Sequence, residues 1–162
     1  ADSIKFFDSL KYTTNGGRTV YGGGGIMPDI FVPLDTSMSS KYYDDLRRNG
    51  IINDFTLNYV DEHRTELAGK YIDVYEFKKT FTVDEEFMNK FIAYAEKKNV
   101  KKDEKGFKTS EKLLRTQIKA LIARDLWNTN AYYVIINELN AFLNKGLQCI
   151  DDGTFAKVKI DQ

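Results

Sequence analysis

Glycine and proline are distributed very unevenly along this chain of 162 residues. Six of the eleven glycines lie between Gly16 and Gly25, and both prolines, Pro28 and Pro33, come before residue 34. Glycine adopts left-handed backbone conformations that other residues avoid, and proline ends helices, so this segment is expected to form turns and loops. The rest of the chain has no proline and five scattered glycines, which favours helices.

The N-terminal region carries a sequence signal for a β-hairpin. Residues 4–14 and 18–21 are rich in β-forming side chains and flank Asn15-Gly16-Gly17. Asn-Gly between two such runs favours a tight turn. The sequence therefore predicts a hairpin, followed by a glycine-rich loop and then a short extended segment at 30–33.

From residue 39 onward, apolar residues recur at the three- and four-residue intervals of amphipathic helices. Gly50, Gly69 and Gly146 are expected to end helices, because glycine readily adopts the left-handed conformation of a C-cap. The sequence predicts a mainly α fold, a helical bundle of about six helices joined by short links. The predicted helices cover residues 40–49, 52–67, 74–80, 82–98, a range from 109 or 110 to about 126, and a range from 128 or 129 to 146.

The predicted helix starts and buried faces rest on capping and periodicity. Thr82 and Glu85 match a capping box, in which both side chains satisfy free backbone N–H groups at a helix start. Residues 154–160 alternate weakly and are interpreted as a short strand or a frayed end. The faces expected to be buried are Phe87, Met88, Phe91, Ile92 and Ala95; then Leu114, Ile118, Leu121, Ile122 and Leu126; then Tyr132, Ile135, Ile136, Leu139, Phe142 and Leu143.

Composition excludes several classes of site. The 24 basic and 24 acidic residues give no net charge, which argues against nucleic acid or an anionic membrane as a partner. A single cysteine, Cys149, excludes an internal disulfide, and a single histidine, His63, excludes a multi-histidine metal site. No apolar run reaches the roughly 20 residues that span a bilayer, so no transmembrane segment is expected.

The glycine run invites interpretation as a phosphate-binding loop, because backbone N–H groups can surround an anion. A Walker loop continues with Gly-Lys-Ser/Thr and a helix, whereas Ile26-Met27-Pro28 follows here. The dinucleotide fingerprint fails as well, since Met27 stands at its third glycine. We therefore expect no nucleotide cofactor.

Two further candidates have structural explanations. His63, beside Asp61 and Glu62, has the chemistry of a general base, but no nucleophile with a supporting motif accompanies it, so a surface or boundary role is expected. Six lysines between residues 97 and 108 are interrupted by acidic residues and joined by one aromatic, Phe107. This pattern favours a solvated linker over a nucleic-acid surface.

Two short blocks occur in a distinctive order. The first is Leu10 to Thr14 followed by Gly17-Arg18, and the second is Gly25-Ile26-Met27-Pro28-Asp29-Ile30. The first resembles the strand and Gly-Arg turn of carboxy-terminal processing (tail-specific) serine proteases, and the second resembles their Gly-Ile-x-Pro-Asp signature. The helical remainder is similar in kind to the C-terminal extensions of family members from the Bacteroides group. The matching signature residues are Gly17, Arg18, Gly25, Ile26, Pro28 and Asp29.

The resemblance implies peptide-bond hydrolysis by a Ser nucleophile and a Lys general base that burial keeps neutral. In the family, both residues lie upstream, in Ser-Ala-x-Glu and Phe-Gly-Lys-Gly motifs that this chain lacks. No catalytic, cofactor-binding or metal-binding residue is therefore assigned, and the chain alone is expected to be inactive. The full-length enzyme would cleave polypeptides outside the cytoplasm, in the periplasm or envelope.

On this interpretation, residues 1–35 are the last strands and glycine-rich loop of a protease core, and residues 36–162 are a helical C-terminal extension. Arg18 and Asp29 are expected to hold the loop by charge-assisted hydrogen bonds. The alternative is a stand-alone helical interaction module whose glycine-rich segment is a linker. A hairpin cut from its sheet exposes unpaired backbone groups, so a homodimer through residues 4–21 is also expected.

Overall fold

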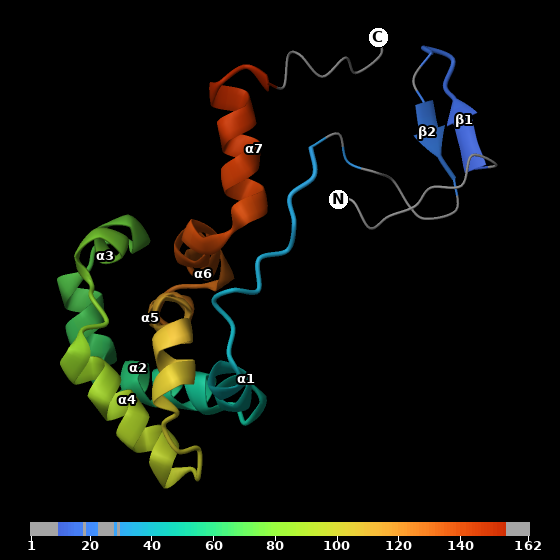
Figure 1. The fold of residues 1–162 in the computed structure, drawn as a ribbon. Helices are drawn as coiled ribbons and strands as arrows, with labels where there is room; N and C mark the ends of the chain where they lie inside the picture. Colours follow the sequence, from blue (N-terminus) through green and yellow to red (C-terminus); the bar gives the residue numbers. More distant parts are fainter. Residues whose placement is uncertain (1–9, 18, 23–27, 29, 155–162) are drawn as a thin grey trace. The chain divides into compact units, whose positions relative to one another are not determined.

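The computed structural model describes residues 10–17, 19–22, 28 and 30–154. Within these residues the fold is mainly α, with seven α-helices and a two-stranded antiparallel hairpin near the N-terminus (Figure 1). This confirms the predicted fold class, and the additional helix arises because the last predicted helix is divided in two. The elements are β1 (Lys11–Thr13), β2 (Thr19–Tyr21), α1 (Lys41–Arg48), α2 (Ile51–Lys70), α3 (Val74–Thr80), α4 (Glu85–Lys97), α5 (Glu104–Leu126), α6 (Thr129–Ile136), the 3₁₀ turn η2 (Asn137–Leu139) and α7 (Ala141–Asp151).

The chain divides into two compact units. One, here called the hairpin unit, combines Ala1–Leu34 with Ala141–Gln162 and so contains β1, β2 and α7. The other, the helical unit, is Asp35–Asn140 and contains α1 to α6 and η2. The sequence predicts that residues 1–35 come from a protease core and that residues 36–162 are its extension. This concerns the origin of the segments and stays a prediction.

The core of the helical unit is built around α5, which packs against α1, α2 and α6. Leu114, Ile118 and Ile122 follow one another at four-residue intervals on α5 and are fully buried, as their spacing predicts. Phe91 of α4 is also fully buried, and its ring meets Phe55 of α2 edge to face, with ring centres 5.3 Å apart. The apolar periodicity of α4 and α5 therefore identifies the core correctly.

Several helix ends form where the sequence places them. Ser40 caps α1, its Oγ accepting a hydrogen bond from the Tyr43 N–H at 3.2 Å. Gly50 separates α1 from α2 with φ of +70°, a conformation that favours glycine. Asp73 caps α3, which covers the predicted residues 74–80, by accepting from two N–H groups of the first turn.

The predicted capping box at Thr82 is wrong, because α4 begins three residues later. Its N-cap is Asp84, whose Oδ1 accepts from the Phe87 N–H at 2.9 Å. Phe81 and Val83 are both buried while Thr82 between them is exposed, an alternation that keeps this link extended. Glu85 is consequently free to reach α5 rather than the start of its own helix.

The lysine-rich segment is only partly a linker. α5 begins at Glu104, not at Thr109 or Ser110, so its first turns include Lys105 and Lys108. Gly106 lies inside α5 and is buried, and a Cβ there would come within 2.9 Å of the Tyr42 Cβ. This glycine therefore permits a close approach of α1 and α5 rather than marking a linker.

Gly69 and Gly146 lie inside helices instead of ending them, contrary to the sequence prediction. No atom lies within 4 Å of a Cβ built on Gly69, so no close contact requires glycine at this position. α2 ends after Lys70, where Tyr71 adopts an extended conformation. Tyr71 is buried there, with its ring centre 5.0 Å from that of Phe77.

The last predicted helix is interrupted at η2 and at Asn140, which adopts φ of −84° and ψ of 95°. Ile135 before the break is fully buried, as expected. Phe142 and Leu143 after it are 55% and 39% exposed, so the prediction that they belong to the same buried face is wrong. In the described residues, no helix combines the length and apolar character that crossing a membrane requires.

The hairpin is shorter than the sequence pattern. β1 and β2 pair in the register Lys11↔Tyr21, Tyr12↔Val20 and Thr13↔Thr19. The predicted extended segment at 30–33 has no regular secondary structure. Residues 4–9 of the predicted first strand and residues 155–160 of the predicted tail lie outside the described residues.

Candidate functional site

The hairpin carries part of the signature predicted from the sequence. Its turn is closed by a hydrogen bond from the Gly17 N–H to the Thr14 carbonyl at 2.9 Å, and Gly17 has φ of +84°. At the other end, the Gly22 N–H donates to the Leu10 carbonyl at 2.7 Å. A Cβ at Gly22 would lie 3.0 Å from the ring of Tyr12. The backbone angle of Gly17 therefore favours glycine, and a side chain at Gly22 would crowd the ring of the exposed Tyr12.

The structure describes only two of the six predicted signature residues, Gly17 and Pro28, and shows no contact between them. Gly17 is in the hairpin turn, and Pro28 is exposed in an irregular segment. The other four signature residues, Arg18, Gly25, Ile26 and Asp29, lie outside the described residues. The expected pairing of Arg18 with Asp29 or with the backbone therefore stays a prediction.

The strands of the hairpin are exposed to solvent. All three residues of β1 are exposed, and Tyr12 and Val20, which face each other across the strands, are 58% and 40% exposed. A two-stranded hairpin is marginally stable in water unless further strands or a helix cover it. By itself, this exposed pair of short strands is therefore expected to be only marginally stable.

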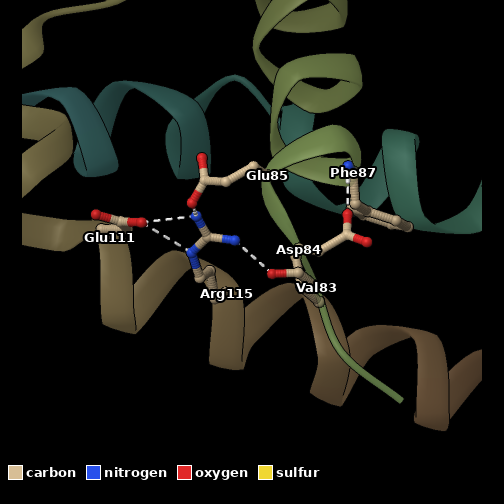
Figure 2. Close-up of polar contacts among 6 residues, drawn as sticks. All are labelled: Val83, Asp84, Glu85, Phe87, Glu111 and Arg115. Atoms are coloured by element: carbon tan, nitrogen blue, oxygen red, sulfur yellow. Dashed lines mark hydrogen bonds and ion pairs between the residues drawn. The ribbon is translucent and has the colours of Figure 1, made fainter.

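In the helical unit, the densest polar cluster surrounds Arg115 of α5 (Figure 2). Its guanidinium bonds to Glu111 through Nε at 2.9 Å and Nη2 at 2.7 Å. The same group donates to the Val83 carbonyl and to the Glu85 carboxylate. One arginine thereby ties the N-terminal end of α4 to the middle of α5.

The Arg115 cluster is structural in its chemistry. The Arg115 side chain is 20% exposed, and each of its three nitrogens donates to a protein oxygen. Such a guanidinium has little capacity left for a substrate anion. Sequence reasoning missed the cluster, although the four-residue spacing of Glu111 and Arg115 was a usable signal.

His63 also has structural partners. Its Nδ1 lies 2.9 Å from the Tyr59 carbonyl, and its ring stacks on that of Tyr59 with centres 4.4 Å apart. The hydroxyl of the buried Ser110 donates to Ser40 Oγ at 2.6 Å, where Ser40 is already used as a helix cap. None of these groups forms the nucleophile and base pair of a hydrolase.

The lysine-rich segment uses its aromatic residue internally. Lys102 forms an ion pair with Glu104 at 2.9 Å, and its Nζ lies 4.8 Å from the centre of the Phe107 ring. Phe107 is partly buried against the core of the helical unit. Its ring is therefore not presented as a platform for a nucleic-acid base.

A shallow groove of about 280 Å³ lies at the N-terminal ends of α3 and α6. Ile72 and Tyr75 on its rim are 89% and 62% exposed, and Trp127 contributes to its wall. The polar residues Asp73 and Asn128 in its lining are both helix caps. Within the described ranges, no group of three or more His, Cys, Asp or Glu residues could hold a metal ion.

The geometry defines a small helical bundle without an assembled catalytic centre in the described residues, joined to a unit containing an exposed hairpin. A family model described as a family of unknown function, DUF8443, matches residues 42–128, which is more than half of the chain. The chain belongs to this family. No curated protein and no solved structure gives a significant match. The matched region runs from α1 to the N-cap of α6, so the match lies within the helical unit and does not include the glycine-rich segment.

Proposed function

We propose that this chain is the C-terminal part of a tail-specific serine endopeptidase, and that its helical unit is a non-catalytic extension of that enzyme. The observation that carries the proposal is the exposed hairpin at the Gly-Arg signature. Gly17 takes its left-handed conformation at the position where the resemblance places the family's turn. The motif and the local backbone are therefore consistent with each other.

The exposure of the hairpin supports a missing sheet. A pair of three-residue strands leaves outward N–H and C=O groups along both edges. In the full-length enzyme, upstream strands would pair with one edge and cover one face, including Tyr12 and Val20. In a chain without those strands, the same edges would pair with a second copy, which is the homodimer expected from the sequence.

The chemistry would lie outside this chain. A Ser nucleophile and a neutral Lys base upstream would hydrolyse peptide bonds without a metal or an organic cofactor. The substrates would be polypeptides, and the enzyme would act in the periplasm or envelope. The helical unit would then regulate access or assembly. Its Arg115 cluster holds helices together, which supports a non-catalytic role.

A second candidate is a stand-alone helical interaction module. The groove with exposed Ile72 and Tyr75 favours it, because large apolar side chains on a rim commonly mark a protein contact. In that case the glycine-rich segment is a linker and the hairpin pairs with no catalytic sheet.

The two candidates are separated by the gene sequence and a cleavage assay. The reading frame upstream of Ala1 should encode Ser-Ala-x-Glu followed by Phe-Gly-Lys-Gly, and the full-length protein should cleave an unfolded polypeptide. Changing the upstream serine to alanine should abolish cleavage, and Arg18→Ala should impair activity or folding. Unrelated upstream sequence, or cleavage by the present chain alone, would refute the proposal.

A further inference from the structure

The chain contains two Asn-Gly pairs, Asn15-Gly16 and Asn49-Gly50. Asparagine is one of the chemically labile side chains of proteins. Its Cγ can be attacked by the backbone nitrogen of the next residue, and a glycine at that position offers the least steric hindrance. The two pairs share this local chemistry, so the structure around each pair decides which one reacts.

Asn15-Gly16 lies at the tip of the hairpin, between β1 and β2, and both residues are exposed. The turn is closed by the hydrogen bond from the Gly17 N–H to the Thr14 carbonyl, which uses neither the Asn15 side chain nor the Gly16 nitrogen. Within the described residues, no hydrogen bond holds the Asn15 amide or the Gly16 N–H. The two reacting groups of this pair are therefore free to approach each other.

Asn49-Gly50 joins α1 to α2, and both of its reacting groups are engaged there. The Asn49 Nδ2 donates to the Asp45 carbonyl at 2.8 Å, and the Gly50 N–H donates to the Arg47 carbonyl at 3.1 Å. The first nitrogen is the one that would leave, and the second is the one that would attack. Both hydrogen bonds must therefore break before Asn49 can react.

We propose that Asn15 is a site of spontaneous deamidation in the folded chain and that the ends of α1 and α2 protect Asn49. The Gly16 nitrogen bonds to the Asn15 Cγ and gives up its proton, while the side-chain amide nitrogen takes up a proton and leaves as ammonia. One water molecule then opens the resulting succinimide ring. The product at position 15 is aspartate or isoaspartate, and the reaction needs no oxidant or reductant.

The products change the hairpin in two ways. Either product adds a negative charge at the turn of a chain whose formal net charge is zero. Isoaspartate also inserts a carbon atom into the main chain between Thr14 and Gly17, whose hydrogen bond closes the turn. Two three-residue strands have few other hydrogen bonds that keep their register. The reaction follows from the turn alone and does not depend on the proposed protease function.

The test is incubation of the 162-residue chain at neutral pH, followed by cleavage after lysine and mass spectrometry. Cleavage gives fragments 12–41 and 42–70, which carry one Asn-Gly pair each. Sequencing of the fragments assigns the exchange of NH₂ for OH to Asn15 or to Asn49. We expect Asn15 to be modified at least about ten times faster than Asn49, because Asn49 must first lose two hydrogen bonds.

Two controls separate the effect of the fold from that of the neighbouring sequence. In a concentration of urea that unfolds the chain, the rate at Asn49 should rise to a value close to that at Asn15. Leu46→Ala, at a fully buried position of α1, should speed the reaction at Asn49 and leave Asn15 unchanged, whereas Leu57→Ala, at an exposed position of α2, should change neither rate. Equal rates in the folded chain, no reaction at Asn15, or an Asn49 that stays slow in urea would each overturn the proposal.

Discussion

Replacing Arg115 by methionine tests which contact of its cluster stabilises the helical unit. Methionine keeps an apolar stem of similar length but removes the guanidinium and all its hydrogen bonds. Glu85 is 78% exposed, so its ion pair with Arg115 contributes about 0.5 kcal/mol. The bond from a charged donor to the carbonyl of the buried Val83 contributes more, about 2 kcal/mol, because its loss leaves that carbonyl without a donor. We expect Arg115→Met to lower the free energy of unfolding by about 2 to 3 kcal/mol and Glu85→Gln by about 0.5 kcal/mol.

The assay is urea unfolding followed by the fluorescence of Trp127, the single tryptophan of the chain. Trp127 lies in the helical unit with its ring centre 5.5 Å from that of Phe77, so it reports on this unit. Lys90→Met is the control, because it breaks an ion pair with Glu86 in which both side chains are more than two-thirds exposed. It should cost about 0.3 kcal/mol. If Glu85→Gln costs as much as the arginine replacement, the ion pair and not the carbonyl bond dominates, and our reasoning is wrong.

Three further tests, with four substitutions, concern the core, the glycines and the pH response. Phe91→Ala at a fully buried position should cost about 3 to 5 kcal/mol in the same urea assay, and a cost below 1 kcal/mol would contradict the core assignment. Gly50→Ala should destabilise the helical unit by about 1 kcal/mol, because φ at this position is +70°. Gly69→Ala lies inside α2 and meets no clash, so it should stabilise the unit by about 0.5 to 1 kcal/mol. The thermal midpoints of the two variants should move in opposite directions. Burial, with the nearby Glu96, raises the pKa of Tyr42 from 10.0 to about 12. As the pH rises, the unfolded chain therefore loses the Tyr42 proton first, and the stability of the folded chain falls between pH 10 and pH 12. Tyr42→Phe should show a smaller fall in urea midpoint over that range. A fall equal to that of the unchanged chain would exclude Tyr42 as a cause.

The sequence predicts helix α3 completely and the start and end of α1 closely, because the deciding groups are local. Ser40 and Asp73 each bond to N–H groups two or three residues away. Gly50 requires a positive φ whatever packs around it. Caps and left-handed glycines can therefore be recognised without knowledge of the tertiary structure.

The predictions from sequence are wrong at positions where residues distant in the chain determine the local structure. Thr82 does not cap α4 because Phe81 and Val83 on either side of it are buried. Glu85 does not complete a capping box because Arg115, thirty residues along the chain, offers it a cation. In the sequence, Gly106 resembles a linker glycine, but in the structure it packs closely against Tyr42. Local patterns alone cannot reveal such contacts.

The candidate site divides in the same way. The turn glycine Gly17 could be predicted from the Asn-Gly signal, and its geometry follows from the backbone alone. The exposure of Phe142 and Leu143 on α7 could not, because their spacing only shows that an apolar face exists. After the break at Asn140, Phe142 and Leu143 are exposed, although the sequence assigned them to the buried face that includes Ile135.

The division into two units has a consequence for biosynthesis and folding. The hairpin unit is assembled from two segments that are separated in the chain by the whole helical unit. Joining the ends of a flexible loop of about a hundred residues costs about 4 kcal/mol in chain entropy. The ribosome synthesises α7 after the whole helical unit, so the hairpin unit can be completed only after residues 35–140 have been made.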